Sequence, residues 1–324
     1  MALRAEVLMT VGLIDVDAES RGKVTFPNLP LMKLSAWHKA QGDEVGWYDK
    51  TGATHYDRVY LARVFGDEYT HEYEGPINAD EVIRGGSGYA IHVEQEKEHY
   101  CKAEDPDLPE EIDHIMPDYS LYGIEDTAYG FLTKGCPRGC DFCHVKDMQG
   151  RRVRTVARLS EFWTGQKKIV LLDPNITASP DFFLHIKDLA DSRAYVDFSQ
   201  GLDIRMLTPE KAEALKTVRT KMIHFAWDRP KDDLEQRFRE VSAALMTARR
   251  HTLKDKVSVY ILTNFDSTHE EDLHRIQVIR ECKMQPYVMI YRKETAPLET
   301  RKLQRWCNPF IFWKVPTFEE YQKK

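Results

Sequence analysis

Three of the six cysteines of this 324-residue chain lie in one stretch, Gly135-Cys136-Pro137-Arg138-Gly139-Cys140-Asp141-Phe142-Cys143-His144. Their spacing is C-x3-C-x2-C, so three thiolates on a short loop can converge on one soft metal centre. Zinc and iron–sulfur clusters are the centres that thiolate ligands select. The stretch therefore predicts a metal site.

The spacing bears on which metal is expected. A structural zinc site has four ligands, usually from two separated pairs, and this chain has no second Cys-x2-Cys pair. Three cysteines on a four-iron cube leave one iron without a protein ligand, which is an open position for chemistry. Two alternatives stay open: a Cys3His zinc site with His144 as fourth ligand, and cysteines clustered by chance.

The loop resembles the signature loop of the radical S-adenosylmethionine (radical SAM) superfamily, because an aromatic residue precedes the last cysteine and a short apolar strand precedes the loop. The resemblance implies a [4Fe–4S] cluster on Cys136, Cys140 and Cys143, whose free iron chelates S-adenosylmethionine. It also implies reductive cleavage to a 5′-deoxyadenosyl radical that abstracts hydrogen from a substrate. An electron donor such as flavodoxin or ferredoxin is then expected, while the substrate is not identified.

Composition limits the classes of protein. At 42% hydrophobic residues the chain can bury the core of one large or two modest domains. The apolar runs are short and the N-terminus has no apolar core, so neither a membrane span nor a signal peptide is expected. Six cysteines with three clustered do not suggest disulfides, and a reduced, cytoplasmic protein is expected. The net charge of −6 argues against a surface that is basic throughout.

The first third of the chain predicts a small parallel α/β layer. Strands are expected at residues 5–13, 44–49, 57–64 and 82–86. Asn28 and Gly42 are the expected first and last caps of a helix between the first two strands.

This order of elements is similar to the Rossmann-like cobalamin-binding domain that precedes many radical SAM cores, with a Gly85-Gly86 turn near the cofactor's tail. The match is partial. There is no Asp-x-His-x-x-Gly motif, and Gly75 and Pro76 interrupt the segment where a helix would be needed. Cobalamin, and a cobalamin-dependent methyl transfer with it, is therefore the less favoured alternative.

Residues 93–113 carry nine acidic residues against two lysines, with two prolines, which predicts a solvated linker. The expected domains are a Rossmann-like domain (1–92), an acidic linker (93–120), the radical SAM core (121–293) and an aromatic C-terminal docking segment (294–324). The alternative for the last segment is a wall that lines the substrate.

From residue 127 onward, strands and helices alternate. Strands are expected at 128–132, 168–172, 194–198, 222–227, 257–263 and 286–291, and helices at 181–189, 209–218, 231–250 and 270–281. Six such units predict an α/β fold with a partial TIM-type (βα)6 barrel. The active site of such a barrel forms at the carboxyl ends of its strands.

The resemblance assigns S-adenosylmethionine contacts to residues near these strand ends. Arg205 is expected to pair with the carboxylate of S-adenosylmethionine, because a guanidinium suits a bidentate pair. The other expected contacts are Phe142, Asp173, Asn175, Gln200, Asp203, Asp228 and Asn264. For each strand-end residue the alternative is a side chain that satisfies loop backbone.

Residues 146–168 carry seven basic and two acidic residues. This net +5 raises nucleic acid or another anionic molecule as a partner, against the simpler interpretation of a solvated flank. A non-enzymatic binding module stabilised by zinc is the hypothesis from another functional class.

Overall fold

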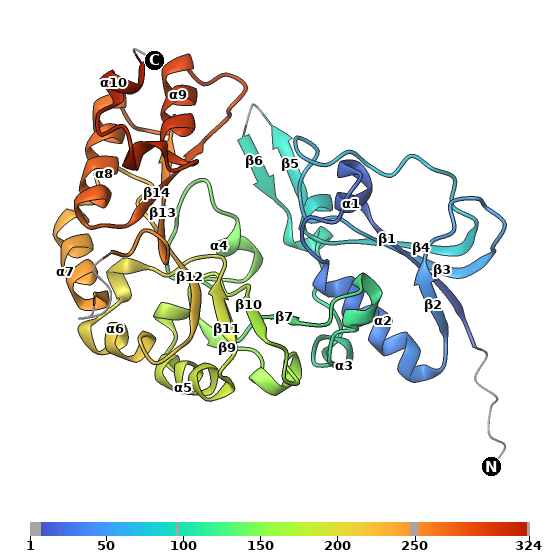
Figure 1. Cartoon of the computed structure of the whole chain (residues 1–324). Coiled ribbons are helices and arrows are strands. Elements are labelled where there is room, and N and C mark those ends of the chain that lie inside the picture. Colours follow the sequence, from blue (N-terminus) through green and yellow to red (C-terminus); the bar gives the residue numbers. More distant parts are fainter. Residues whose placement is uncertain (1–7, 95–96, 247–251, 323–324) are drawn as a thin grey trace. The chain divides into compact units, whose positions relative to one another are not determined.

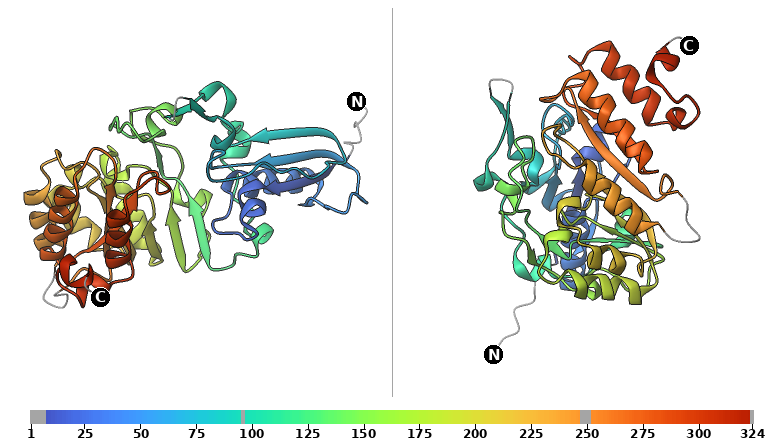
Figure 2. Two further views of the ribbon diagram at one scale, coloured as in Figure 1. Left: turned by 90° about the horizontal axis from the view of Figure 1, so that it is seen from above. Right: turned by 90° about the vertical axis from the view of Figure 1, so that its left-hand side faces the viewer.

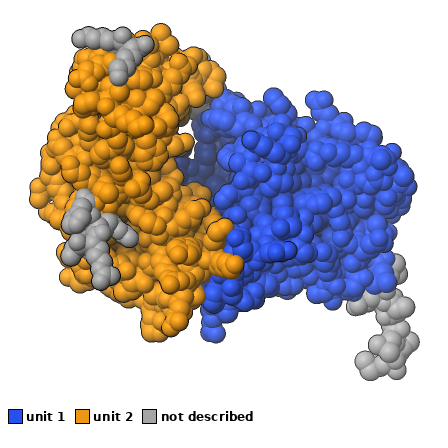
Figure 3. Space-filling view, viewed as in Figure 1, with its two compact units in different colours: residues 1–130, 137–151, 157–166 blue, residues 131–136, 152–156, 167–324 orange. Residues whose placement is uncertain are grey.

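The computed structural model describes residues 8–94, 97–246 and 252–322. They form two compact units, which Figure 3 colours separately. Unit 1 comprises residues 1–130, 137–151 and 157–166, and unit 2 comprises residues 131–136, 152–156 and 167–324. The boundary between the units therefore falls inside the cysteine loop, directly after Cys136.

Unit 1 contains a four-stranded parallel sheet of order β2-β1-β3-β4 (Figure 1). Its strands are β1 (Thr10–Asp15), β2 (Glu44–Trp47), β3 (Tyr56–Ala62) and β4 (Ala79–Gly85). The central strand β1 is buried on both faces, which accounts for its continuous apolar run. The predicted parallel α/β layer is confirmed. Residues 5–7 of the first predicted strand lie outside the described residues.

Two helices follow β1, namely α1 (Val16–Arg21) and α2 (Leu29–Gln41). Asn28 caps α2, since its Oδ1 accepts a hydrogen bond from the backbone N–H of Leu31 at 3.2 Å. Gly42 ends α2 with a left-handed φ of 91°. The predicted α2 is confirmed with both caps, whereas the short α1 was not expected.

Residues 93–120, expected as a linker, carry regular structure within unit 1. β5 (Ile91–Glu94) and β6 (Lys97–Tyr100) form a projecting antiparallel hairpin (Figure 2). A short helix, α3 (Glu110–Asp113), follows. Glu104 forms an ion pair with His92 of β5 at 2.5 Å, so part of the acidic charge is used within this segment.

A six-stranded sheet has the order β14-β13-β12-β11-β10-β7, of which β10 to β14 belong to unit 2 and β7 to unit 1. The strands are β7 (Thr127–Gly130), β10 (Lys168–Leu171), β11 (Tyr195–Phe198), β12 (Thr220–Ala226), β13 (Val257–Thr263) and β14 (Gln285–Ile290). The pairings from β10 to β14 are parallel. The six predicted strands are confirmed with boundary shifts of one or two residues, and the described strands form no closed barrel.

Helices connect these strands and lie along one side of them in Figure 1. They are α5 (Phe182–Ser192), α6 (Pro209–Leu215), α7 (Glu235–Leu245) and α8 (His269–Glu281). The helix expected over 231–250 begins later, because residues 231–234 form a turn in which the backbone oxygen of Asp232 accepts from Trp227 Nε1 at 2.9 Å. Residues 247–250 of that expectation lie outside the described residues. No helix in the described ranges is long and apolar enough to cross a membrane.

The C-terminal segment packs onto β14 through α9 (Leu298–Cys307), and α10 (Phe318–Gln322) packs on α9. The ring of Trp306 lies 5.2 Å from that of Phe312 and 5.5 Å from that of Phe318. All three side chains are buried, and Trp306 Nε1 donates to the backbone oxygen of Val315 at 2.9 Å. This aromatic cluster is a core of its own that holds the segment in unit 2.

Replacing Trp306 by alanine leaves a large cavity in this cluster. We expect Trp306→Ala to lower the free energy of unfolding by about 3–5 kcal/mol. Leu298→Ala is the matched control, because Leu298 lies in the same helix and is 63% exposed. Urea denaturation followed by circular dichroism measures both variants. Equal stabilities of the two variants would show that the aromatic cluster contributes little.

Candidate functional site

The segment that leads into the cysteine loop is held by Asp173, directly after β10. Its Oδ2 accepts from the backbone N–H of Leu132 at 3.1 Å, and its Oδ1 accepts from that of Thr133 at 2.5 Å. The Thr133 hydroxyl donates to the same Oδ1 at 2.6 Å. Both carboxylate oxygens thus bind Leu132 and Thr133, at the start of the strand β8 (Thr133–Lys134). This strand ends two residues before Cys136.

Burial raises the pKa of Asp173 to about 6, although the hydrogen bonds from Thr133 and Leu132 act in the opposite direction. Its side chain is only 3% exposed. The structure therefore gives Asp173 the alternative role considered for strand-end residues, that of binding loop backbone. A contact with S-adenosylmethionine stays a prediction.

Asn175 lies between the first cysteine and Asp203. Asn175 Nδ2 lies 3.4 Å from Cys136 Sγ and 3.5 Å from Asp203 Oδ2. Asn175 is 2% exposed, and its Oδ1 is buried without a hydrogen-bond partner. Because a buried amide oxygen without a donor is costly, this atom is poised to accept from a bound group.

Arg205 is held between two carboxylates. Its Nη1 donates to Asp203 Oδ1 at 3.2 Å, and its Nη2 donates to Asp232 Oδ2. Burial alone would lower the pKa of Arg205, but Asp203 and Asp232 raise it, so the guanidinium stays charged. Since a guanidinium has five N–H donors, these two bonds leave others for a ligand.

Asp228 follows β12 and faces the same charged group. Burial raises the pKa of Asp228 to about 6, while the charges of Arg205 and Arg275 lower it and that of Asp232 raises it again. The carboxyl edge of the sheet therefore presents alternating acidic and basic groups from the ends of several strands. Asp203, Arg205 and Asp228 share one electrostatic environment, as the strand-end rule predicts.

Arg275 is the residue of this region that sequence reasoning missed. It lies on α8, is 1% exposed, and forms an ion pair with Asp272 of the same helix. Its Nη1 donates to the backbone oxygen of Trp227 at 2.5 Å, and its Nη2 donates to that of Leu262 at 2.9 Å. One buried guanidinium thus binds the carboxyl ends of β12 and β13, directly before Asp228. The available signal was an Asp–Arg pair spaced by three on the buried face of a helix.

The remaining strand-end candidates differ in their surroundings. Asn264 has a left-handed φ of 60°, and its Nδ2 donates to the backbone oxygen of Tyr291 at 2.7 Å, so it links the ends of β13 and β14. Gln200 is exposed in the turn after β11. The following Gly201 has a φ of 91°, and Leu202 N–H donates to the backbone oxygen of His224 at 2.7 Å.

The second half of the cysteine loop belongs to unit 1. Cys140, Phe142 and Cys143 are half-buried there. His144 Nε2 lies 3.1 Å from Glu98 Oε2 of the β5–β6 hairpin. This contact gives His144 a loop-supporting role.

In the described part of the chain, no three His, Cys, Asp or Glu side chains are arranged as a group that could hold a metal ion. The chemistry of the donor set still fits a thiolate-bound metal, because the loop carries three cysteines at the spacing C-x3-C-x2-C. The orphaned Oδ1 of Asn175 beside Cys136 adds a buried acceptor next to that donor set.

The face of the sheet opposite the helices carries a row of polar and aromatic side chains on four neighbouring strands. Asp197 Oδ1 of β11 lies 3.5 Å from His224 Nε2 of β12. The His224 ring stacks on Tyr260 of β13 at 5.1 Å, and Tyr260 meets Tyr287 of β14 at 5.7 Å. Burial raises the pKa of Tyr260 to about 12, and the charge of Asp197 acts in the same direction. The hydroxyl of Tyr260 therefore stays protonated at neutral pH.

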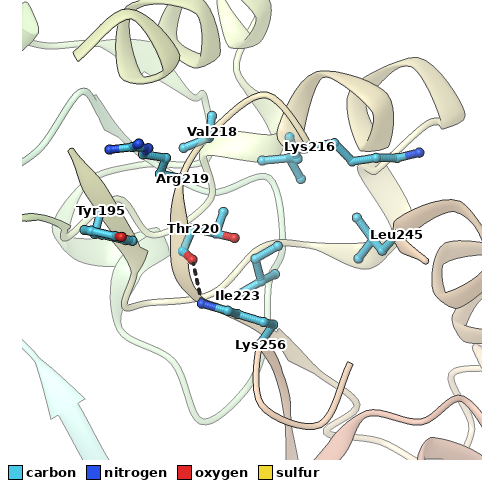
Figure 4. Close-up of a pocket in the computed structure, with 9 residues that line it drawn as sticks. Tyr195, Lys216, Val218, Arg219, Thr220, Ile223, Leu245 and Lys256 are labelled. Carbon is cyan, nitrogen blue, oxygen red and sulfur yellow. Dashed lines mark hydrogen bonds between the residues drawn. The ribbon is translucent and has the colours of Figure 1, made fainter. Parts of the chain in front are cut away.

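A cavity of about 360 Å³ lies at the opposite, amino-terminal edge of this sheet (Figure 4). Its walls include the buried side chains of Leu215, Val218 and Ile223. Lys216 and Arg219 point away from each other in Figure 4, and Lys256 Nζ donates to the backbone oxygen of Thr220 at 3.2 Å. Because the cations do not converge, the cavity lacks the geometry of an anion site.

The chain matches no protein-family model and no curated protein. The function is therefore inferred from the geometry of the carboxyl edge and of the cysteine loop.

Removing the buried guanidinium tests whether it holds this edge together. We expect Arg275→Met to lower the free energy of unfolding by about 3–5 kcal/mol, because Asp272 is left buried without its partner. Arg239→Met on the neighbouring α7 is the control, since its ion pairs with Glu235 and Glu281 are exposed. Chemical denaturation measures both, and a loss below about 1 kcal/mol for Arg275→Met would contradict the assignment.

The raised pKa of Asp228 predicts a pH dependence of stability. A carboxyl whose folded pKa is raised from 3.8 to about 6 stabilises the fold fully below its unfolded pKa and loses that contribution as the pH rises through about 6. We expect the free energy of unfolding of Asp228→Asn to fall less than that of the wild type between about pH 4 and pH 7. Asp255→Asn, at an exposed carboxyl, should follow the wild-type profile. Parallel wild-type and Asp228→Asn profiles would contradict the prediction.

Proposed function

We propose that this protein is a radical SAM enzyme. The observation that carries the proposal is the C-x3-C-x2-C loop, whose first cysteine lies beside Asn175 at the carboxyl edge of a parallel sheet. Asn175 in turn neighbours Asp203, which binds Arg205. This is the arrangement of donors and charges that a cluster and an amino acid cofactor would require.

The six-stranded sheet supports the proposed partial (βα)6 barrel. Its strands succeed one another in chain order, which is what a barrel built from consecutive βα units requires. Phe225 of β12 packs on Phe238 of α7, so that face of β12 is covered by helix. The opposite face carries Asp197 and His224.

In this proposal Cys136, Cys140 and Cys143 hold the [4Fe–4S] cluster. When bound, the cluster supplies the electron that cleaves S-adenosylmethionine to a hydrogen-abstracting radical. The chain's own groups bind and orient the cofactor. Arg205 offers its unused N–H groups to a carboxylate, and Asn175 Oδ1 accepts from an amino group.

Asp228 would accept hydrogen bonds from an amino or hydroxyl group of the cofactor at the end of β12. Phe142, Gln200 and Asn264 stay candidates for adenine and ribose contacts. Because Asp173 already binds residues 132 and 133, it acts in this proposal by placing Cys136.

We further propose that the substrate lies against the helix-free face of the sheet. His224 Nδ1 is buried there without a hydrogen-bond partner, and Asp197 holds the other ring nitrogen at 3.5 Å. Tyr287 is 43% exposed on the same face. These groups would bind a substrate that combines a planar or apolar part with polar groups.

At the glycine turn of unit 1, a Cβ on Gly86 would lie 2.4 Å from the backbone oxygen of Arg63, whereas a Cβ on Gly85 would meet nothing within 4 Å. Cobalamin stays the less favoured alternative, because the chain has no Asp-x-His-x-x-Gly motif. We therefore assign no step of the reaction to cobalamin.

Metal analysis after anaerobic purification and reconstitution tests the proposal. We expect a brown wild-type protein with about four irons per chain and cleavage of S-adenosylmethionine by the reduced protein. Cys136→Ala, Cys140→Ala and Cys143→Ala should each lose the cluster and all cleavage, because two thiolates do not hold the cube stably.

The matched controls are the other three cysteines. Cys101→Ala, Cys282→Ala and Cys307→Ala should keep the wild-type iron content, since Cys282 and Cys307 are buried in the core of unit 2 and Cys101 lies after β6. A colourless protein with one zinc would overturn the proposal and favour the zinc-stabilised module. Equal iron loss in both groups would show that the ligands are misassigned.

A further inference from the structure

Basic residues gather where the strands of unit 2 begin. Five short segments lead into β10, β11, β12, β13 and β14, and together they hold nine lysines and arginines against one acidic residue, Asp255. The whole chain has a net charge of −6, so the charge of these segments is opposite in sign to that of the chain. We call them the amino-edge surface, which comprises residues 167–168, 193–195, 216–221, 252–257 and 282–285.

The parallel pairing from β10 to β14 brings the five segments to one edge of the sheet, opposite the carboxyl edge that holds the candidate site. Two contacts join neighbouring segments. Arg219 Nη1 donates to the backbone oxygen of Arg193 at 3.2 Å, and Lys256 Nζ donates to that of Thr220 at 3.2 Å. The amino-edge surface is therefore continuous across at least β11, β12 and β13, and it lies within unit 2.

Acidic side chains offset only part of this charge. Lys216 pairs with Glu213 at 2.5 Å, and Lys221 Nζ lies 3.7 Å from Asp197 Oδ2. The exposed Arg193 and Arg219 instead lie next to each other, where like charges repel. A bound polyanion would remove that repulsion and would be attracted by the local positive potential.

An exposed aromatic ring and an apolar cavity lie within the same surface. Tyr195, the first residue of β11, is 51% exposed, and Cζ of Arg219 lies 5.8 Å from the centre of its ring. Both residues line the cavity of about 360 Å³, at one end of it in Figure 4, and Leu245 lies at the other end. An aromatic ring beside an apolar cavity suits a planar group such as a nucleobase.

We propose that the amino-edge surface binds single-stranded nucleic acid. Its cations diverge, so they do not fit one compact anion, but they fit phosphates that follow one another along a backbone. Tyr195 stacks on a base, which is accessible where the bases are not paired in a duplex. Lipid headgroups would use the same charges but offer no planar group for Tyr195 and the cavity. The inference is independent of the proposed function, because the surface includes neither the cysteine loop nor the carboxyl edge.

The experiment measures the fluorescence anisotropy of labelled oligo(U) and oligo(dT) of about 12 nucleotides, titrated with the full chain at several salt concentrations. We expect the logarithm of the wild-type binding constant to fall with that of the salt concentration with a slope of about −3, as for roughly four phosphate contacts. Arg193→Gln and Arg219→Gln should each reduce the slope by about 0.7. Tyr195→Ala should weaken binding about tenfold and leave the slope unchanged.

Lys293→Gln is the matched control, because Lys293 is exposed and follows the carboxyl end of β14 at the opposite edge. It should bind as the wild type does, and circular dichroism checks that every variant is folded. Absence of binding by the folded wild type would overturn the inference, whether or not the protein holds iron. An equal loss in Lys293→Gln, or a loss in Arg152→Gln of the segment 146–168 in place of Arg193→Gln and Arg219→Gln, would also overturn it.

Two further results would reject nucleic acid as the partner while keeping the surface basic. Unchanged affinity in Tyr195→Ala would show that the surface attracts polyanions without accepting a base. Tighter binding to vesicles of phosphatidylserine and phosphatidylcholine than to either oligonucleotide would assign the surface to a membrane.

Discussion

The carboxylate of Asp173 is the contact on which the candidate site depends. It joins the end of β10 to the segment that precedes Cys136 through three hydrogen bonds from residues 132 and 133. A buried carboxylate is tolerated only because its oxygens are satisfied. The same contact places Cys136 beside Asn175, since both follow directly from the two joined segments.

A second buried charge, that of Arg275, has the same function at the ends of β12 and β13. Arg275 binds the backbone oxygens of Trp227 and Leu262 and pairs with Asp272. These oxygens lie where β12 and β13 end, so the guanidinium determines how Asp228 leaves its strand. In both places a charge that would be costly when unpaired binds backbone at the ends of strands.

The polar residues at the carboxyl edge of the sheet are therefore of two kinds. Asp173, Asn264 and Arg275 are consumed by hydrogen bonds to the backbone. Asn175 retains an unpaired buried oxygen, and Arg205 retains unused donors. The residues with remaining hydrogen-bonding capacity are the ones that a bound cofactor could use, and Asn175 lies beside the first cysteine.

The sequence alone determined the strands of the two large parallel sheets, the caps of α2 and the spacing of the thiols, because these depend on residues that are neighbours in the chain. Asn28 and Gly42 cap α2 as their chemistry predicts, and Asp203, Arg205 and Asp228 gather at one edge because parallel strands end together. Only the tertiary structure decided which polar groups are already used. Asp173 meets residues 132 and 133 about forty positions away in the chain, and Arg275 binds the backbone oxygen of Trp227, which is 48 positions away. Such pairings are decided by how segments distant in sequence pack, which no local pattern records.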